Sequence, residues 1–204
     1  MEEKNAQGRR RSFTHAELKC FFQSDVFAAT KQDDGWWLAV LCAMTGARGG
    51  ELMKAPSELV MIGDTPCIDL REAGTKTKNA SRLVPVIDEL KELGFLDYAA
   101  RQKRLGRPLI YGEGLSGRPR SEQASMNRLI RTVFPDDLDL MGYSFRHHFR
   151  QMLSASNIGL ELSNKVFGHR GGETYERYGQ GLSEAEAQVF VERVHFPFSL
   201  IFLL

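Results

Sequence analysis

Apolar positions along the chain mark a series of helices. The segment Thr14-His15-Ala16-Glu17 has the Thr-x-x-Glu pattern of an N-terminal capping box, which predicts a helix running to about Ala29. A second, more apolar helix is expected over residues 36–44 and ends at Thr45-Gly46, and a short one follows from about Gly50. Further helices are predicted at residues 121–133, 144–155, 161–167 and 183–194.

Three segments between these helices are rich in β-forming residues, namely 59–62, 67–70 and 83–87, and Gly, Asp, Pro and Asn separate them. The last two flank the polar sequence 74–81, which predicts a hairpin tip. The chain is therefore expected to be mainly α-helical with a small antiparallel β-sheet, an α+β fold.

The ends of the chain differ from its middle. Residues 1–11 are polar and predict a flexible lead or linker, while residues 12–195 predict one domain. The tail, residues 196–204, is almost wholly apolar. It is too short to span a bilayer, so we expect it to pack on its own core, with docking onto a neighbouring protomer as the alternative.

Length and composition place the chain among ordinary globular proteins. The 204 residues suit a single domain, and the composition is 42% hydrophobic and 26% charged. Because no stretch reaches about 18 consecutive apolar residues, we expect no membrane partner and a cytoplasmic location. Cys20, Cys42 and Cys67 lie far apart without a C-x-x-C spacing, so reduced, partly buried thiols are expected rather than disulfides or a zinc ribbon.

Net charge is only +1, which alone is weak evidence for a nucleic-acid partner. Residues 101–131 nevertheless hold eight Lys or Arg against two Glu, a local net charge of +6. A one-sided basic face of this kind can hold a phosphate backbone, and a solvated charged surface is the alternative.

Four short motifs occur in order along nearly the whole chain. They are Thr45-Gly46-Ala47-Arg48-Gly49-Gly50-Glu51-Leu52, then Lys76-Thr77-Lys78 with Arg82-Leu83-Val84-Pro85, then Ser144-Phe145-Arg146-His147-His148-Phe149, and finally Phe167-Gly168-His169 with Tyr178 nine residues after the histidine. Each motif alone is weak, but together they resemble the boxes of phage-integrase-type tyrosine recombinases. The resemblance implies the catalytic-domain fold of that family, and we expect the family's usual separate N-terminal DNA-binding domain to be absent from this chain.

The two arginines of these boxes suit the chemistry of a phosphodiester. Its negative charge repels nucleophiles, and two guanidiniums on the non-bridging oxygens neutralise that charge and hold the phosphorus in line. Arg48 and Arg146 are therefore candidate catalytic residues, because arginine stays charged and presents a planar fork. Glu51 either supports Arg48 from the same helical turn or is an exposed helix charge.

The resemblance assigns the remaining catalytic roles. Tyr178 would attack the phosphorus and remain joined to the 3′ end, and His169 would donate a hydrogen bond to the phosphate. Tyr175 is a rival nucleophile with a different spacing. Lys76 on the hairpin tip is the candidate general acid for the leaving 5′ oxygen, although Lys78 would lie on the same face of an extended strand. Since the covalent bond conserves the energy needed for rejoining, we expect no nucleotide cofactor. The sequence has no cluster of carboxylates with the spacing of metal ligands, so we expect no metal either.

One position departs from the family pattern. The second box usually reads His-x-x-Arg, and here its first position is Tyr143. A phenol is a poorer proton acceptor near neutral pH than an imidazole, but it can still donate a hydrogen bond to phosphate. His147 is expected to support the site, whereas His148, two residues beyond Arg146 on a helix, is expected to point elsewhere.

The expected function is site-specific DNA recombination, in phage or prophage integration or excision, through a 3′-phosphotyrosyl intermediate. The expected partner is double-stranded DNA, with possible accessory DNA-bending proteins. By resemblance, the protein is expected to be a homotetramer on DNA and a monomer when free. We expect it to be associated with the nucleoid. Relaxation of DNA like a type IB topoisomerase, or non-catalytic DNA binding by a regulator derived from an integrase, are the alternatives. Further candidate DNA contacts are Lys78, Arg82, Arg118, Arg120 and Arg128.

Overall fold

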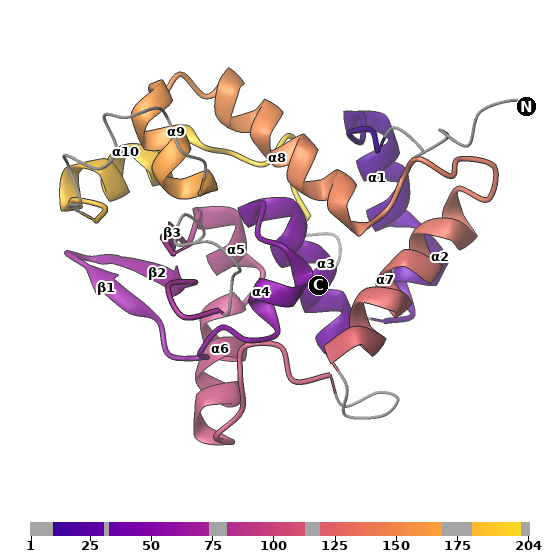
Figure 1. Cartoon of the computed structure of the whole chain (residues 1–204), viewed down its shortest axis with the longest axis horizontal. Helices are drawn as coiled ribbons and strands as arrows, with labels where there is room; N and C mark the ends of the chain where they lie inside the picture. Colours follow the sequence, from indigo (N-terminus) through magenta and orange to yellow (C-terminus); the bar gives the residue numbers. More distant parts are fainter. Residues whose placement is uncertain (1–9, 31–32, 74–80, 113–118, 169–180, 201–204) are drawn as a thin grey trace, which may run out of the picture.

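The computed structural model of the chain describes residues 10–30, 33–73, 81–112, 119–168 and 181–200, with the backbone alone at 119–123. Ten helices lie in these ranges (Figure 1): α1 (His15–Gln23), α2 (Asp25–Ala28), α3 (Asp34–Thr45), α4 (Gly49–Leu52), α5 (Asp88–Glu92), α6 (Phe95–Arg104), α7 (Pro119–Val133), α8 (Gly142–Ala155), α9 (Leu160–Phe167) and α10 (Glu184–Arg193). The strands there are β1 (Val60–Ile62), β2 (Thr65–Asp69) and β3 (Leu83–Pro85).

The strands form one antiparallel sheet in the order β1-β2-β3. Val60 pairs with Cys67, and Cys67 in turn pairs with Pro85. This confirms the predicted mainly helical fold with a small antiparallel sheet, and the pairing of the last two predicted strands. Strand β3 is shorter than predicted, because Ile87 already serves as the N-cap residue of α5.

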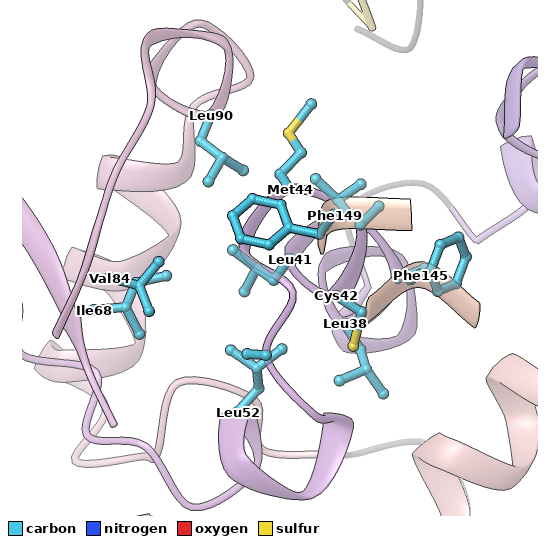
Figure 2. Close-up of a cluster of buried hydrophobic side chains, with 14 of the residues drawn as sticks. Leu38, Leu41, Cys42, Met44, Leu52, Ile68, Val84, Leu90, Phe145 and Phe149 are labelled. Atoms are coloured by element: carbon cyan, nitrogen blue, oxygen red, sulfur yellow. The ribbon is translucent and has the colours of Figure 1, made fainter. Parts of the chain in front are cut away.

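Helix α3 is the centre of the hydrophobic core. Every residue from Trp36 to Thr45 is buried, as expected for a helix that is apolar all round. It packs against α8 and α7. In Figure 2, side chains of this core gather from α3, α4, α5, α8 and the sheet: Leu38, Leu41, Met44, Leu52, Ile68, Val84, Leu90, Phe145 and Phe149.

The N-terminal helix differs from the prediction in one respect. The capping box is present, since Thr14 Oγ1 accepts from the backbone N–H of Glu17 and the Glu17 carboxylate accepts from that of Thr14. A single helix to Ala29 is wrong, however, because the backbone is extended at Ser24 and splits the segment into α1 and α2. The Ser24 hydroxyl then caps α2 by accepting from the N–H of Phe27 at 3.2 Å. Serine competes well for such N-cap positions, which explains the break.

The described part of the apolar tail packs on this chain's own core. Phe196 and Leu200 are buried, and the Phe196 ring lies 6.1 Å from that of Phe22. The backbone N–H of Phe196 also donates to the Glu89 carboxylate at 3.0 Å. These contacts agree with the first interpretation of the tail, and residues 201–204 lie outside the described residues.

Two further observations bear on the sequence expectations. Cys42 and Cys67 are buried and Cys20 is exposed, and all three are free thiols. Among the helices described here, none is long and apolar enough to cross a bilayer.

Candidate active site

A glycine turn joins α3 to the first arginine motif. Helix α3 ends at Gly46, whose φ of 61° is in the left-handed region that favours glycine. A Cβ atom at this position would lie 2.3 Å from Cδ1 of Phe149 on α8. Glycine therefore allows the turn to approach α8 closely, and Arg48 follows two residues later as the N-cap of α4.

A buried carboxylate holds Arg48 in place. Glu51 accepts from the Arg48 backbone N–H and from its Nη1, each at 2.8 Å. Its side chain is only 4% exposed, whereas that of Arg48 is 44% exposed. The sequence alternative that Glu51 supports Arg48 is thus confirmed, and the exposed-charge alternative is wrong.

Glu51 also binds a second arginine. Arg82, just before β3, donates from Nη2 to Glu51 Oε2 at 2.9 Å and from Nη1 to Oε1 at 3.3 Å. Burial alone would raise the pKa of Glu51, but the hydrogen bonds and charge of Arg82, together with Arg48, outweigh burial and hold that pKa below its ordinary value. Glu51 is therefore a carboxylate shared by two guanidiniums.

Arg146 of α8 links two segments that are far apart in the sequence. Its Nη1 donates to the carbonyl of Gly46 at 2.6 Å, and its Nη2 donates to the carbonyl of Phe167 at 2.7 Å. The guanidinium carbon lies 3.8 Å from the centre of the Phe167 ring, and the residue is 2% exposed. The second arginine box thus contacts both the first box and the start of the closing box, Phe167-Gly168.

The surroundings of Arg146 are strongly positive. Burial first, and then the charges of Arg82 and Arg48, partly offset by Glu51, together lower its pKa to about 10. A pKa of about 10 still leaves the group charged at neutral pH. We call Arg48, Glu51, Arg82 and Arg146 the arginine cluster; three positive charges and one negative charge give it a formal charge of +2.

Tyr143 lies one turn before Arg146 on α8, and it is half-buried. Its ring meets the ring of His147 edge-on, with centroids 5.0 Å apart. The guanidinium of Arg10 lies 5.6 Å from the centre of the Tyr143 ring. Tyr143 is therefore beside the arginine cluster and surrounded by cationic or ionisable neighbours, which include His147.

The two histidines after Arg146 face different surroundings. His148 is buried, and its Nδ1 lies 3.1 Å from the carbonyl of Phe13, so the prediction that it points elsewhere is confirmed. His147 is half-buried and lines a surface hollow on α8. Burial lowers the pKa of His147, and so do the nearby charges of Arg146, Arg10 and Arg150.

Several predicted site residues lie outside the described residues: Lys76, Lys78, Arg118, His169, Tyr175 and Tyr178, as well as the side chain of Arg120. Their assignments stay predictions. Arg128 is exposed on α7 and donates to the Ser125 hydroxyl at 2.8 Å, so its proposed DNA contact is also untested.

Arg82 was predicted as a DNA contact, but it is 5% exposed and binds Glu51, which fits an internal role better. The sequence held a signal for this. Arg82 and Val84 are two residues apart along an extended segment, so they share a face, and both are buried. An arginine on the inward face of a strand needs an internal carboxylate, and Glu51 supplies it.

The chemistry available here is recognition of an anion. Within the described ranges, no group of three or more His, Cys, Asp or Glu side chains is placed to hold a metal ion. The arginine cluster instead offers positive charge and N–H donors in a small volume, which suits a phosphate group.

The fold is that of a tyrosine recombinase catalytic domain. The chain is similar to the crystal structure of XerA recombinase, with a TM-score of 0.57 and 16% sequence identity over 99% of this chain. It covers 64% of the length of that XerA chain. No model of a known protein family matches the sequence, and no curated protein matches it. At 16% identity the likeness shows the fold, and any function must be argued from the site.

Proposed function

We propose that this protein is a tyrosine recombinase catalytic domain, which cuts and rejoins DNA through a 3′-phosphotyrosyl intermediate. One observation carries the proposal. Arg146 donates to the carbonyl of Gly46, one hundred residues earlier, and to that of Phe167, and Arg82 pairs with Glu51, so all four motifs found in the sequence are joined by contacts. Independent surface motifs would have no reason to meet at one buried guanidinium.

The two catalytic arginines have different roles in this arrangement. Arg48 is the more exposed, and Glu51 fixes its direction, so it is the group that first meets a DNA phosphate. A guanidinium has five N–H donors, and the carbonyls of Gly46 and Phe167 accept two of those of Arg146. Its Nε–H has no acceptor among the described residues but is buried, so it reaches a non-bridging oxygen only when bound DNA shifts the side chain.

The nucleophile and proton carriers complete the reaction. The Tyr178 phenol loses its proton to water as its oxygen attacks the phosphorus, the bond to the 5′ oxygen breaks, and Lys76 donates a proton to that oxygen. His169 donates a hydrogen bond to the phosphate. Because the phosphodiester energy is conserved in the phosphotyrosine bond, attack by a 5′ hydroxyl rejoins the strand without a cofactor.

The proposed biological setting is site-specific recombination, as in phage or prophage integration or excision. The protein would act as a homotetramer on two DNA sites and as a monomer when free, with accessory DNA-bending proteins as possible partners. The presence of Tyr143 where the family usually has a histidine favours a second candidate function. This candidate is a DNA-binding regulator that has lost strand cleavage, because a phenol is a poorer base than an imidazole.

A nicked suicide DNA substrate tests the proposal directly. The wild-type protein should form a covalent protein–DNA band that is resistant to denaturation, and Tyr178→Phe should abolish it. Tyr175→Phe is the matched control and should leave the band unchanged. A band that survives Tyr178→Phe contradicts the nucleophile assignment. Tight, sequence-specific binding with no band in the wild type supports the regulator instead.

A further inference from the structure

A surface hollow of about 580 Å³ lies against α8, next to the segment that precedes α1. Its lining consists almost entirely of polar and charged side chains, among them Arg10, Ser12, His147, Arg150, Gln151 and Ser154. We call it the α8 hollow. The DNA contacts predicted from the sequence lie in other segments and include none of the basic residues of this hollow.

The segment before α1 is fixed across α8, so the hollow has defined walls. The Ser12 hydroxyl donates to the Gln151 side chain at 2.9 Å. Arg11 forms ion pairs with both Glu17 and Asp137, which holds the lead against α1 and the segment before α8. Arg11 was predicted to belong to a flexible lead, yet these pairs tie it to the domain. These contacts place the guanidinium of Arg10 above the ring of Tyr143, on one side of the hollow.

Among the described residues, the charges of the α8 hollow have no carboxylate partner. In the described part of the chain, neither Arg10 nor Arg150 forms an ion pair, and no Asp or Glu lines the hollow. A second hollow of about 730 Å³ beside β2 differs in this respect. It contains carboxylates, and its Arg71 pairs with Asp69 at 2.7 Å. Two unpaired guanidiniums facing one concavity repel each other unless an anion lies between them.

The α8 hollow lies near Arg146, one member of the arginine cluster. His147 lines the hollow and directly follows Arg146 in the sequence. Arg150 lies 5.5 Å from the centre of the Phe167 ring, the same ring that Arg146 covers at 3.8 Å. The positive potential of the hollow also lowers the pKa of His147, in addition to burial. An anion in the hollow would therefore lie close to Arg146.

We propose that the α8 hollow binds a backbone phosphate of the DNA strand next to the phosphate that is cleaved, through Arg10 and Arg150. This rests on the proposed function and names the surface that positions the duplex. A DNA strand has regularly spaced phosphates, so one phosphate can bind the arginine cluster while a neighbouring phosphate binds the α8 hollow. Arg10 and Arg150 supply the charge, and the neutral His147, Ser12 and Gln151 side chains supply hydrogen bonds.

The test is the salt dependence of DNA binding, measured by fluorescence anisotropy on a labelled duplex between low and moderate salt. Each phosphate contact contributes about 0.9 to the slope of log K against log salt concentration. Arg10→Gln and Arg150→Gln should each reduce that slope, and the double variant, which loses the whole phosphate contact, should reduce it by about 1. Arg150→Lys should restore the slope, because the cation is retained.

Arg71→Gln is the matched control, since Arg71 is an exposed arginine of the other hollow with a carboxylate partner. It should leave the slope unchanged, and all variants should unfold at the wild-type temperature by circular dichroism. If Arg10→Gln and Arg150→Gln behave like Arg71→Gln while the wild type binds DNA, the α8 hollow is not a phosphate site and the proposed function still stands. If the wild type shows no salt-dependent DNA binding, the proposed function itself fails.

Discussion

Replacing Glu51 with glutamine tests the electrostatic design of the arginine cluster. The substitution keeps the shape of the side chain but removes the carboxylate that both Arg48 and Arg82 bind in the cluster. Glu51 is 3% exposed and accepts hydrogen bonds from both Arg48 and Arg82. Breaking a buried ion pair by removing one partner costs about 3–5 kcal/mol, because the remaining charge stays desolvated.

The expected result is a large loss of stability. For a domain of about 200 residues, each kcal/mol lowers the melting temperature by roughly 2–4 °C, so Glu51→Gln should lower it by about 6–20 °C. Thermal and urea denaturation followed by circular dichroism measure this. Glu58→Gln is the control, because Glu58 is 68% exposed in its pair with Lys103, and such surface pairs contribute only about 0–1 kcal/mol.

The effect should also depend on pH. The folded-state pKa of Glu51 lies below its ordinary value of 4.5, so the stability it contributes is present above that value and is lost as pH falls through the folded pKa. The stability difference between wild type and Glu51→Gln should thus be largest at neutral pH and shrink in acid. A loss below about 1 kcal/mol at pH 7, or a difference that persists unchanged in acid, would refute the reasoning.

Two other substitutions test how the site is supported. Gly46→Ala places a Cβ 2.3 Å from Phe149 at a φ of 61°, so it should destabilise the protein by at least ~1 kcal/mol in urea denaturation and weaken covalent adduct formation. Gly50→Ala, whose Cβ would meet nothing within 4 Å, is its control, and equal effects would contradict the steric argument. Phe196→Ala should cost about 3–5 kcal/mol at a protein concentration where the chain is monomeric. A loss that appears only at high concentration would favour docking of the tail onto a neighbouring protomer.

Local patterns in the sequence determined most of the secondary structure. The capping box at Thr14, the apolar run of α3 and the β-rich segments depend on neighbours within a few residues, so the chain order alone reveals them. The break at Ser24 was missed for a related reason. A serine in a long helical pattern can stay helical or cap a new helix, and the choice depends on how Phe27 packs in the core.

The candidate site was predicted only in part. The motif order named Arg48 and Arg146, and α-helical spacing suggested that Glu51 supports Arg48. The second partner of Glu51 was not foreseen, since Arg82 lies just before β3, 31 residues further along the chain. Lys76, His169 and Tyr178 were named from the motifs alone, and they stay predictions.

The sequence by itself determined most of the elements and named the candidate residues for phosphate chemistry. Tertiary structure alone decided that Arg146 binds the carbonyls of Gly46 and Phe167, that Arg82 is internal, and that Arg10 meets α8. The physical reason is that burial and charge pairing depend on contacts between distant segments. A basic residue looks the same in the sequence whether it faces water, a buried carboxylate or a hollow without one.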